Sequence, residues 1–385
     1  MKPPSRLPYL LAYYACLIAV GLMASIFGPT LGSLAGQTGT TLQGISVVLA
    51  MRPMGYLVGT LLSGRLLDRM PGHPILAAST ALAACAVAVM PLAPSLGVLA
   101  ALVLIMGFAQ GLMDVGSNTL IVWVYHEKVG PYLNGLHFAF GVGAFAAPLL
   151  VARSISLSGS YPWAYWAVAL FSLPLLALML TVPSPAHEHS ASSAAPAPWD
   201  KGLAALFVAF FFLYGGSEAG FGAWIYSYAT RAGLSDPTDA AKLNSLFWGL
   251  LGIGRLIGIP IVAKLSPRHF LSAIIPLTLA SLALLLWGPA THGSLWLATA
   301  GTGLGLACIF PTMLVYAGRA LSRGGRVSGQ MTSFFFVGSS SGSMSLPWLM
   351  GQAIEPWGPK AAMGIVLAAL SLLAVLFVAI LKAED

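Results

Sequence analysis

Four ionisable residues lie within long apolar stretches of this sequence. They are Arg52, Asp114, Glu218 and Arg255. A charge in the middle of a membrane is costly, so charged side chains there face protein or water and usually find partners. Two acids and two bases suit ion pairs, moving gates or the binding of a coupling cation. The sequence alone leaves their pairing open.

The acid at position 114 has polar neighbours at helical spacing. Gly107, Gln110, Gly111, Asp114 and Asn118 are separated by three or four residues, so a helix places them on one face. Carboxylate and amide groups on one face offer the paired donors and acceptors that a solute rich in hydroxyl groups requires. The alternative is that these groups hold neighbouring helices together, a common role of polar side chains in membranes.

A second polar face is predicted around Glu218. Tyr214 lies on the same side of the helix, and Trp224 lies at its flank, where a ring could cover the C–H face of a sugar. Glu218 could bind a coupling cation or form an ion pair with Arg255. The remaining candidate substrate contacts, on other predicted helices, are Asn134, His137 and Gln330.

The composition shows which elements must position these residues. The chain has 385 residues, of which 58% are hydrophobic and 8% charged, and its mean hydropathy is +0.86. Soluble domains carry about 25% charged residues, and a soluble protein this apolar would expose large adhesive patches. Most of the chain must therefore lie in lipid. The sequence contains no nucleophile motif, phosphate-binding loop or metal-ligand spacing, so we expect neither an enzyme nor a metal site.

Apolar runs account for most of the length. A bilayer needs about 20 apolar residues per helix, and we count twelve such runs, so the predicted fold class is an all-α membrane protein with twelve transmembrane helices. The stretch 184–200 is rich in Ser, Ala and Pro and predicts a cytoplasmic linker between six-helix bundles at 1–183 and 201–385. The runs cover about residues 8–32, 41–64, 74–93, 95–124, 131–155, 161–183, 201–230, 239–263, 270–288, 293–318, 326–352 and 357–381.

Small residues recur at matching places in the two halves, which predicts a duplicated six-helix unit. Duplicated halves are typical of transporters, and small residues at four-residue spacing let helices pack closely. The matched pairs are Gly55 and Gly59 with Gly254 and Gly258, Gly107 and Gly111 with Gly301 and Gly305, and Gly143 and Pro148 with Gly342 and Pro347.

Lysines and arginines set the expected orientation. Twelve of the 18 fall on segments that are cytoplasmic if both termini are inside, and four fall on the opposite segments. We therefore expect a multi-pass cell-membrane protein with both termini in the cytoplasm, located in the inner membrane if the source is a bacterium. This placement also explains the net charge of +7 without nucleic acid. The first run is long enough to be a retained helix, and the expected partners are membrane lipids around a monomer.

Several stretches resemble a known family. The segment from Gly64 through Asp68 and Arg69 to Gly72 and His73 resembles the signature between helices 2 and 3 of the major facilitator superfamily. The family's last basic pair is replaced here by His73 and a proline. Three further stretches resemble the fucose-permease branch, which includes sodium-dependent glucose transporter-like proteins: Asp114–Asn118, Asn134–Gly141, and Tyr214–Glu218 continuing to Gly222 and Trp224.

The resemblance implies a secondary active transporter that works by alternating access. It implies two pseudo-symmetric six-helix bundles, with helices 1, 4, 7 and 10 lining a central cavity and a sugar as the substrate. It also implies symport with Na⁺ or H⁺ and no other cofactor. Asp68 would take part in a contact between the halves that breaks as the transporter opens inward. Fucose permease has an acid in helix 1 as a proton site, whereas helix 1 here has only Ser25 and Thr30 as small polar groups near its outer end.

Two other functions fit the same sequence. An exporter of drugs or lipids from the same superfamily would have a more apolar cavity and would use its charges mostly as gates. A receptor or sensor with the transporter fold would bind a solute without moving it. Uptake of labelled sugars under separate sodium and proton gradients distinguishes the three functions.

Overall fold

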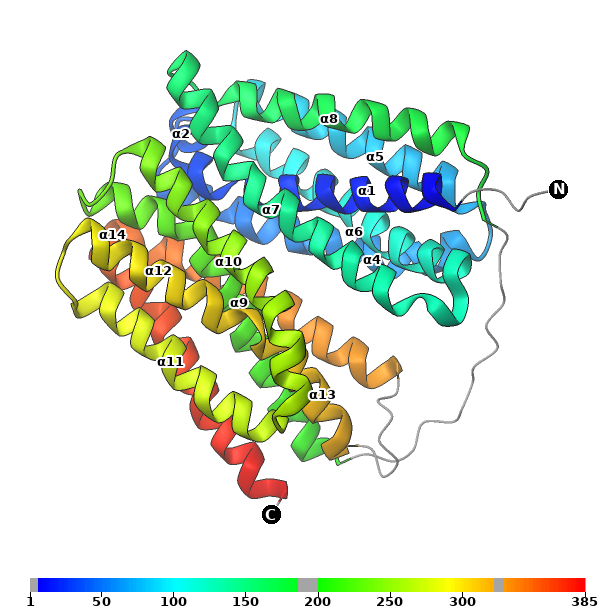
Figure 1. Cartoon of the computed structure of the whole chain (residues 1–385). Helices are drawn as coiled ribbons and strands as arrows, with labels where there is room; N and C mark the ends of the chain where they lie inside the picture. The colour runs from blue at the N-terminus through cyan, green and yellow to red at the C-terminus, as the bar shows by residue number, and fades with distance from the viewer. Residues whose placement is uncertain (1–5, 186–199, 322–328, 385) are drawn as a thin grey trace. The chain divides into compact units, whose positions relative to one another are not determined.

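The computed structural model describes residues 6–185, 200–321 and 329–384, and within these ranges it contains helices and no strands. The chain divides into two compact units, Met1–Ala191 and Ser192–Asp385 (Figure 1). The predicted linker at 184–200 lies mostly outside the described residues. The all-helical fold class is confirmed, and each unit is considered separately below.

The first unit is built from five long helices and a broken first helix. Helix α1 ends at Ser25, and a short 3₁₀ turn follows at Gly28–Thr30, before α2 continues the same membrane span to Gln37. Pro29 lies in this turn and removes a backbone N–H, which explains why the helix does not run through. The bounds are α1 Leu7–Ser25, α2 Leu31–Gln37, α3 Leu42–Ile45, α4 Val47–Leu67, α5 Gly72–Val89, α6 Leu96–Tyr125, α7 Gly130–Ser158 and α8 Pro162–Thr181.

In the second unit, one predicted helix is split into two, and two predicted helices form one continuous element. Cys308 separates α12 from α13, although the sequence predicts one run over 293–318. The last two predicted runs form one element, α14, which turns sharply at Gly358, where φ is 80° and favours glycine. The bounds are α9 Lys201–Arg231, α10 Pro237–Lys264, α11 Pro267–Trp287, α12 His292–Ala307, α13 Ile309–Leu321 and α14 Gly329–Glu384.

Ten stretches of the described residues are long and apolar enough to cross a membrane. One of them, Ser333–Ala383, includes both of the last two predicted runs. Helix α10 is not among the ten, and three of its side chains, at 259, 262 and 263, lie outside the described part. The chain is therefore a multi-pass membrane protein, while the number twelve stays a prediction.

Polar residues cap helices where the apolar runs begin. The carboxylate of Asp200 accepts hydrogen bonds from the backbone N–H groups of Gly202 and Leu203, at 2.8 and 3.1 Å. The hydroxyl of Ser95 accepts one from Val98 at 3.4 Å. The first N–H groups of a helix have no partner within it, so these caps satisfy donors that would otherwise remain unpaired. They explain why α9 and α6 begin within a residue or so of the predicted positions.

Close glycine contacts join equivalent helices in both units. A Cβ atom at Gly143 of α7 would overlap the carbonyl of Ile18 in α1, and one at Gly342 of α14 would overlap the carbonyl of Phe212 in α9. The sequence match between the fifth and eleventh predicted helices, which are α7 and the first part of α14, is therefore accompanied by equivalent contacts. Helix α7 meets α1, and α14 meets α9. Glycine permits this backbone approach because it has no side chain.

The matched glycines of α6 and α12, the fourth and tenth predicted helices, make different contacts. Gly107 of α6 faces the backbone of α4 at Arg52, whereas Gly301 and Gly305 of α12 face Ser281 and Thr278 of α11. The side of α12 that meets α10 carries Gly303, Ala307 and Cys308 instead. Equal spacing in the sequence matched these two helices but did not predict their contacts, because spacing does not determine how far a helix is rotated about its axis.

Candidate functional site

The polar face predicted on α6 is present and meets α4. Gly107 and Gly111 bring the two backbones together, since a Cβ atom at either would overlap a carbonyl of α4. This approach places Arg52 and Tyr56, one turn apart on α4, against the polar residues of α6. The glycines therefore determine how close the side chains of the site can come.

Asp114 is held by neutral hydrogen-bond donors. Its Oδ2 accepts a bond from the hydroxyl of Tyr56, and its Oδ1 accepts one from the amide of Asn118 at 2.8 Å. His137 of α7 interacts with this carboxylate electrostatically. Asp114 and Asn118 are both half-buried. The predicted face thus has a carboxylate at its centre whose two hydrogen-bond partners are uncharged.

Arg52 contacts an amide rather than the acid. Its Nη1 donates to Oε1 of Gln110 at 3.4 Å, and the Nε2 of Gln110 donates to the carbonyl of Val20 in α1 at 3.1 Å. Gln110 is completely buried. It therefore joins α1, α4 and α6, which favours the interpretation that it holds helices together. In the described part of the chain, Asp114 forms no ion pair with Arg52.

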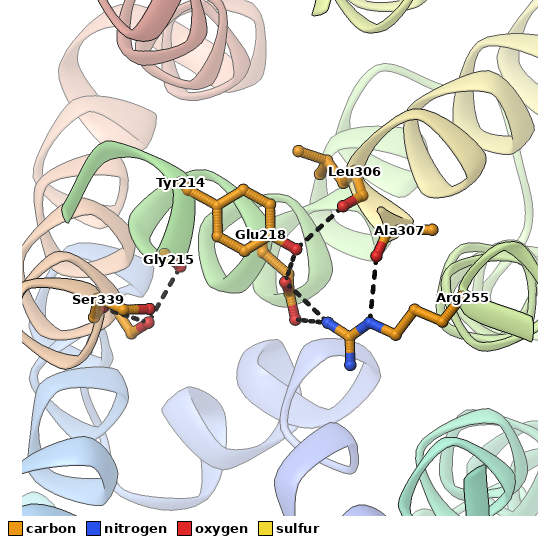
Figure 2. A network of polar contacts seen from close by, with 8 residues as sticks. Tyr214, Gly215, Glu218, Arg255, Leu306, Ala307 and Ser339 are labelled. Atoms are coloured by element: carbon orange, nitrogen blue, oxygen red, sulfur yellow. Dashed lines mark hydrogen bonds and ion pairs between the residues drawn. The ribbon is translucent and has the colours of Figure 1, made fainter. Parts of the chain in front are cut away.

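The second cluster lies in the other unit and has a different composition (Figure 2). The Nη2 atom of Arg255 in α10 lies 3.3 and 3.4 Å from the two carboxylate oxygens of Glu218 in α9. The hydroxyl of Tyr214, one turn before Glu218, also contacts this carboxylate. The ion pair that the sequence left as an alternative for Glu218 is present.

Both partners of Glu218 also reach the backbone at the end of α12. Arg255 Nε donates to the carbonyl of Ala307 at 3.3 Å, and the hydroxyl of Tyr214 lies 3.0 Å from the carbonyl of Leu306 (Figure 2). Side chains from α9 and α10 thus converge on a third helix. The Glu218 side chain is 19% exposed and that of Arg255 is 35% exposed, so water screens the pair only in part.

Another predicted substrate contact, Trp224, packs against α14 instead. Trp224 is completely buried, and its indole nitrogen donates to the carbonyl of Pro347 in α14 at 2.8 Å. This position favours packing between α9 and α14 over contact with a solute. Asn134 and His137 are exposed on α7. The side chain of Gln330 lies outside the described residues.

Comparison with known proteins decides the family. The sequence model described as "Major Facilitator Superfamily" matches residues 13–343. The chain belongs to the Major Facilitator Superfamily. Its relatives are membrane transporters, so the prediction that it is not an enzyme is confirmed.

Relatives of this superfamily member cover most of its length. The chain is 27% identical over 376 residues to the mouse protein "Sodium-dependent glucose transporter 1A", covering 88% of each protein. It is 28% identical over 378 residues to the human "Sodium-dependent glucose transporter 1", covering 88% of this chain and 72% of that protein.

Solved structures have the same fold at low identity. A bacterial homologue of the human lysosomal transporter Spinster superposes with a TM-score of 0.81 at 13% identity, covering 99% of this chain and 98% of that chain. A D-xylose-proton symporter superposes with a TM-score of 0.74 at 13% identity, covering 96% and 97%. These likenesses show the superfamily fold.

The superfamily signature lies at the end of α4 and the start of α5. Gly64, Asp68 and Arg69 are exposed, and nothing lies within contact distance of a Cβ atom at Gly64. His73 differs, because its ring is buried. Its Nδ1 lies 2.7 Å from the carbonyl of Val182 and its Nε2 lies 2.9 Å from the hydroxyl of Tyr13.

These contacts determine the role of His73. A carbonyl can only accept, so Nδ1 carries the proton towards Val182 and Nε2 accepts the proton of Tyr13 in the neutral ring. His73 therefore joins α5 to α1 and to the chain after α8. Its buried ring is therefore not available at the surface as a basic residue.

Tyr56 and the carbonyls of Leu306 and Ala307 were not predicted as functional groups. Tyr56 was detectable, because it follows Arg52 by four residues and so shares its helix face. The carbonyl of Ala307 also had a signal, since Pro311 four residues later has no N–H to offer it. Only the fold shows which side chains reach these groups.

Proposed function

We propose that this protein is a sodium-coupled symporter that moves a sugar across the membrane by alternating access, and that Asp114 is the carboxylate that binds the coupling ion. The observation that carries the proposal is the setting of Asp114, which is a half-buried acid with neutral hydrogen-bond donors. A carboxylate without an arginine partner keeps its charge available for a cation.

The other intramembrane acid is less suited to bind a coupling ion. Glu218 already has the guanidinium of Arg255 as its counter-charge. A cation that bound there would have to displace the arginine or add to its positive charge. Asp114 requires neither, since Tyr56 and Asn118 can rotate their dipoles when an ion arrives.

The sugar substrate and the sodium ion are supported by the relatives and by the side chains available. Two relatives that each match 88% of this chain are named sodium-dependent glucose transporters. The face of α6 offers the amide of Asn118 beside the acid, and α7 offers Asn134 and His137. Amide, imidazole and carboxylate groups together can pair with hydroxyl groups that both donate and accept.

The remaining expectations on localisation and assembly belong to the same proposal. We infer that both termini lie in the cytoplasm, because lysines and arginines are concentrated on the segments that this orientation places inside. We also propose that the protein works as a monomer among membrane lipids, and that in a bacterium it lies in the inner membrane.

Uptake into proteoliposomes tests the function. Purified protein is reconstituted, and labelled hexoses are supplied under an inward sodium gradient or, separately, under a proton gradient. We expect a sugar to accumulate above its external concentration with sodium alone. Accumulation with protons alone would reassign the ion, and absence of uptake of every sugar together with drug resistance in cells would favour an exporter. Binding without uptake would favour a receptor.

The Asp114→Asn variant tests the coupling site. The amide has nearly the same shape but no charge, so we expect gradient-driven accumulation to fall by about tenfold or more while exchange of sugar across the membrane continues. Asp239→Asn is the matched control, because Asp239 is an exposed acid paired with Lys242 at 2.7 Å. Unchanged accumulation by Asp114→Asn would remove Asp114 from the coupling site.

A further inference from the structure

The break between α12 and α13 leaves a backbone carbonyl without its helical donor. Helix α12 ends at Ala307 and α13 begins at Ile309. In a continuous helix the carbonyl of Ala307 would accept from the N–H of residue 311, but that residue is a proline. A carbonyl inside a membrane needs another donor, and proline breaks are tolerated where side chains provide one.

The donor comes from α10. Arg255 Nε donates to the carbonyl of Ala307 at 3.3 Å, while its Nη2 binds Glu218 at 3.3 Å (Figure 2). The guanidinium is planar and its donors are fixed in relation to one another. Nη2 and the Nε–H lie on the same edge of the guanidinium, so binding of the carboxylate by Nη2 orients the Nε–H towards the break.

Tyr214 supplies a second connection from the same carboxylate. Its hydroxyl contacts Glu218 and also lies 3.0 Å from the carbonyl of Leu306. A hydroxyl has a single proton, so it serves these two acceptors in turn rather than together. The tyrosine can therefore exchange between the acid and the backbone of α12 without moving its ring.

Packing places the break directly against α10. A Cβ atom at Gly254 would overlap the side chain of Ala307, and one at Gly258 would overlap the sulfur of Cys308. The thiol of Cys308 also donates to the carbonyl of Gly254 at 3.2 Å. The glycines thus bring the freed carbonyl within reach of Arg255 on the same helix face.

We propose that Tyr214, Glu218 and Arg255 form a clamp on this break, in which Glu218 positions Arg255 so that its Nε–H holds the carbonyl of Ala307, while Tyr214 shares its one proton between Glu218 and the carbonyl of Leu306. The clamp fixes the angle between α12 and α13 while it is closed, and the two segments move relative to each other when it opens. This role rests on the proposed transport function, since a hinge matters only if the helices move during the cycle. Glu218 is then a positioning residue of the hinge.

The clamp is tested by measuring the flexibility of the break. Spin labels are attached at Leu297 in α12 and Val315 in α13, which are 66% and 46% exposed. The exposed Cys85 is first replaced by serine so that it does not react with the label. Cys16 and Cys308 are buried and are left in place. Pulsed electron–electron double resonance then gives the distribution of distances between the two labels. This measurement needs no substrate, so it remains valid if the protein carries no sugar.

Arg255→Lys is the main variant, because it keeps the positive charge near Glu218 and removes the Nε donor. We expect a distance distribution that is about twofold wider. In transport assays we expect a maximal rate about tenfold lower and substrate affinity changed less than twofold, as for the loss of one hydrogen bond to a charged group. Adding Pro311→Ala returns an N–H to Ala307 and should narrow the distribution again.

Tyr214→Phe provides a second variant that keeps the ring and removes only the hydroxyl. It should widen the distribution less than Arg255→Lys does, and it carries the test if the lysine variant does not fold. An unchanged distribution in the variants that fold, or a wide one that Pro311→Ala does not narrow, would overturn the clamp. If the clamp is overturned but the unmodified protein takes up sugar, the proposed transport function still holds. If the clamp is confirmed but no sugar is taken up, only the proposed transport function is contradicted.

Discussion

The two units cross corresponding helices at glycines, but only one of the crossings joins two continuous helices. In the first unit, the glycines of α4 lie against the backbone of α6, which runs unbroken over Leu96–Tyr125. In the second unit, the glycines of α10 lie against Ala307 and Cys308, where α12 has just ended. The same four-residue spacing therefore supports a rigid crossing in one unit and a crossing at a break in the other.

The charges at the two crossings differ in the same way. Arg52 in the first unit binds the amide of Gln110, and Asp114 binds uncharged groups. Arg255 in the second unit binds an acid and a backbone carbonyl at once. The comparison separates two tasks that one sequence pattern could not distinguish. We propose that one unit keeps a carboxylate available for a cation and that the other uses its carboxylate to hold a hinge.

The largest effect is expected where the rigid crossing is disturbed. In Gly107→Ala the new Cβ atom would overlap the carbonyl of Arg52, which is backbone and cannot rotate away. Helix α4 must then shift, at a cost of about 1–3 kcal/mol or more. We expect a clear fall in the melting temperature of the purified protein in detergent, measured by size-exclusion chromatography after heating.

Two control variants make this prediction specific. Gly64→Ala introduces the same methyl group on α4 where nothing lies within contact distance, and it should leave the melting temperature unchanged. Gly301→Ala meets the hydroxyl of Ser281, a side chain that can rotate, and should have an intermediate effect. If Gly107→Ala is as stable as Gly64→Ala, the backbone contact between α4 and α6 is not as close as the structure indicates.

A smaller effect separates the two acids by stability. Glu218→Gln leaves the positive charge of Arg255 without a counter-charge, so we expect a loss of about 1–2 kcal/mol for this partly exposed pair. The double variant Glu218→Gln with Arg255→Gln removes both charges and should recover part of this loss. Asp114→Asn should change stability least, because no arginine depends on it.

Thermal unfolding of these three variants and of the single variant Arg255→Gln, all in the same detergent, tests this order. Equal losses for Asp114→Asn and Glu218→Gln would contradict the difference between the two clusters. A double variant whose loss equals the sum of the two single losses would show that Glu218 and Arg255 do not depend on each other.

Spacing along the sequence predicted which residues share a helix face. Asn118 bonds to Asp114, and Tyr214 bonds to Glu218, because residues four apart on a helix are neighbours. These contacts needed only the helical period. The all-helical membrane fold was equally accessible, since composition and apolar run length impose it. The family followed from the resemblance of short motifs such as Gly64–His73.

Contacts between helices could not be predicted from spacing. A helix has about 3.6 residues per turn. An error of two residues in a boundary therefore moves a side chain about half a turn around the helix axis. The partner of Asp114 is thus Tyr56 rather than an arginine, and Trp224 bonds to Pro347 in the protein interior. The break at Cys308 required knowledge of which side chains replace the missing donor.

The smallest effect is expected at the signature, which has no matched acid in the second unit, where Pro267 follows α10 in place of Asp68. Asp68 is exposed at the end of α4, and its backbone N–H bonds to Gly64, so Asp68→Asn should not unfold the helix. We expect the maximal transport rate to fall about three- to fivefold with substrate affinity within about twofold, because the residue would act on a conformational step. Rates and binding are measured in the same proteoliposomes, with Asp239→Asn as the control for loss of an exposed acid. Poor substrate binding with a normal maximal rate would show instead that Asp68 acts on the substrate site. The first unit would then contain two acids that act on ligand binding, Asp68 and Asp114.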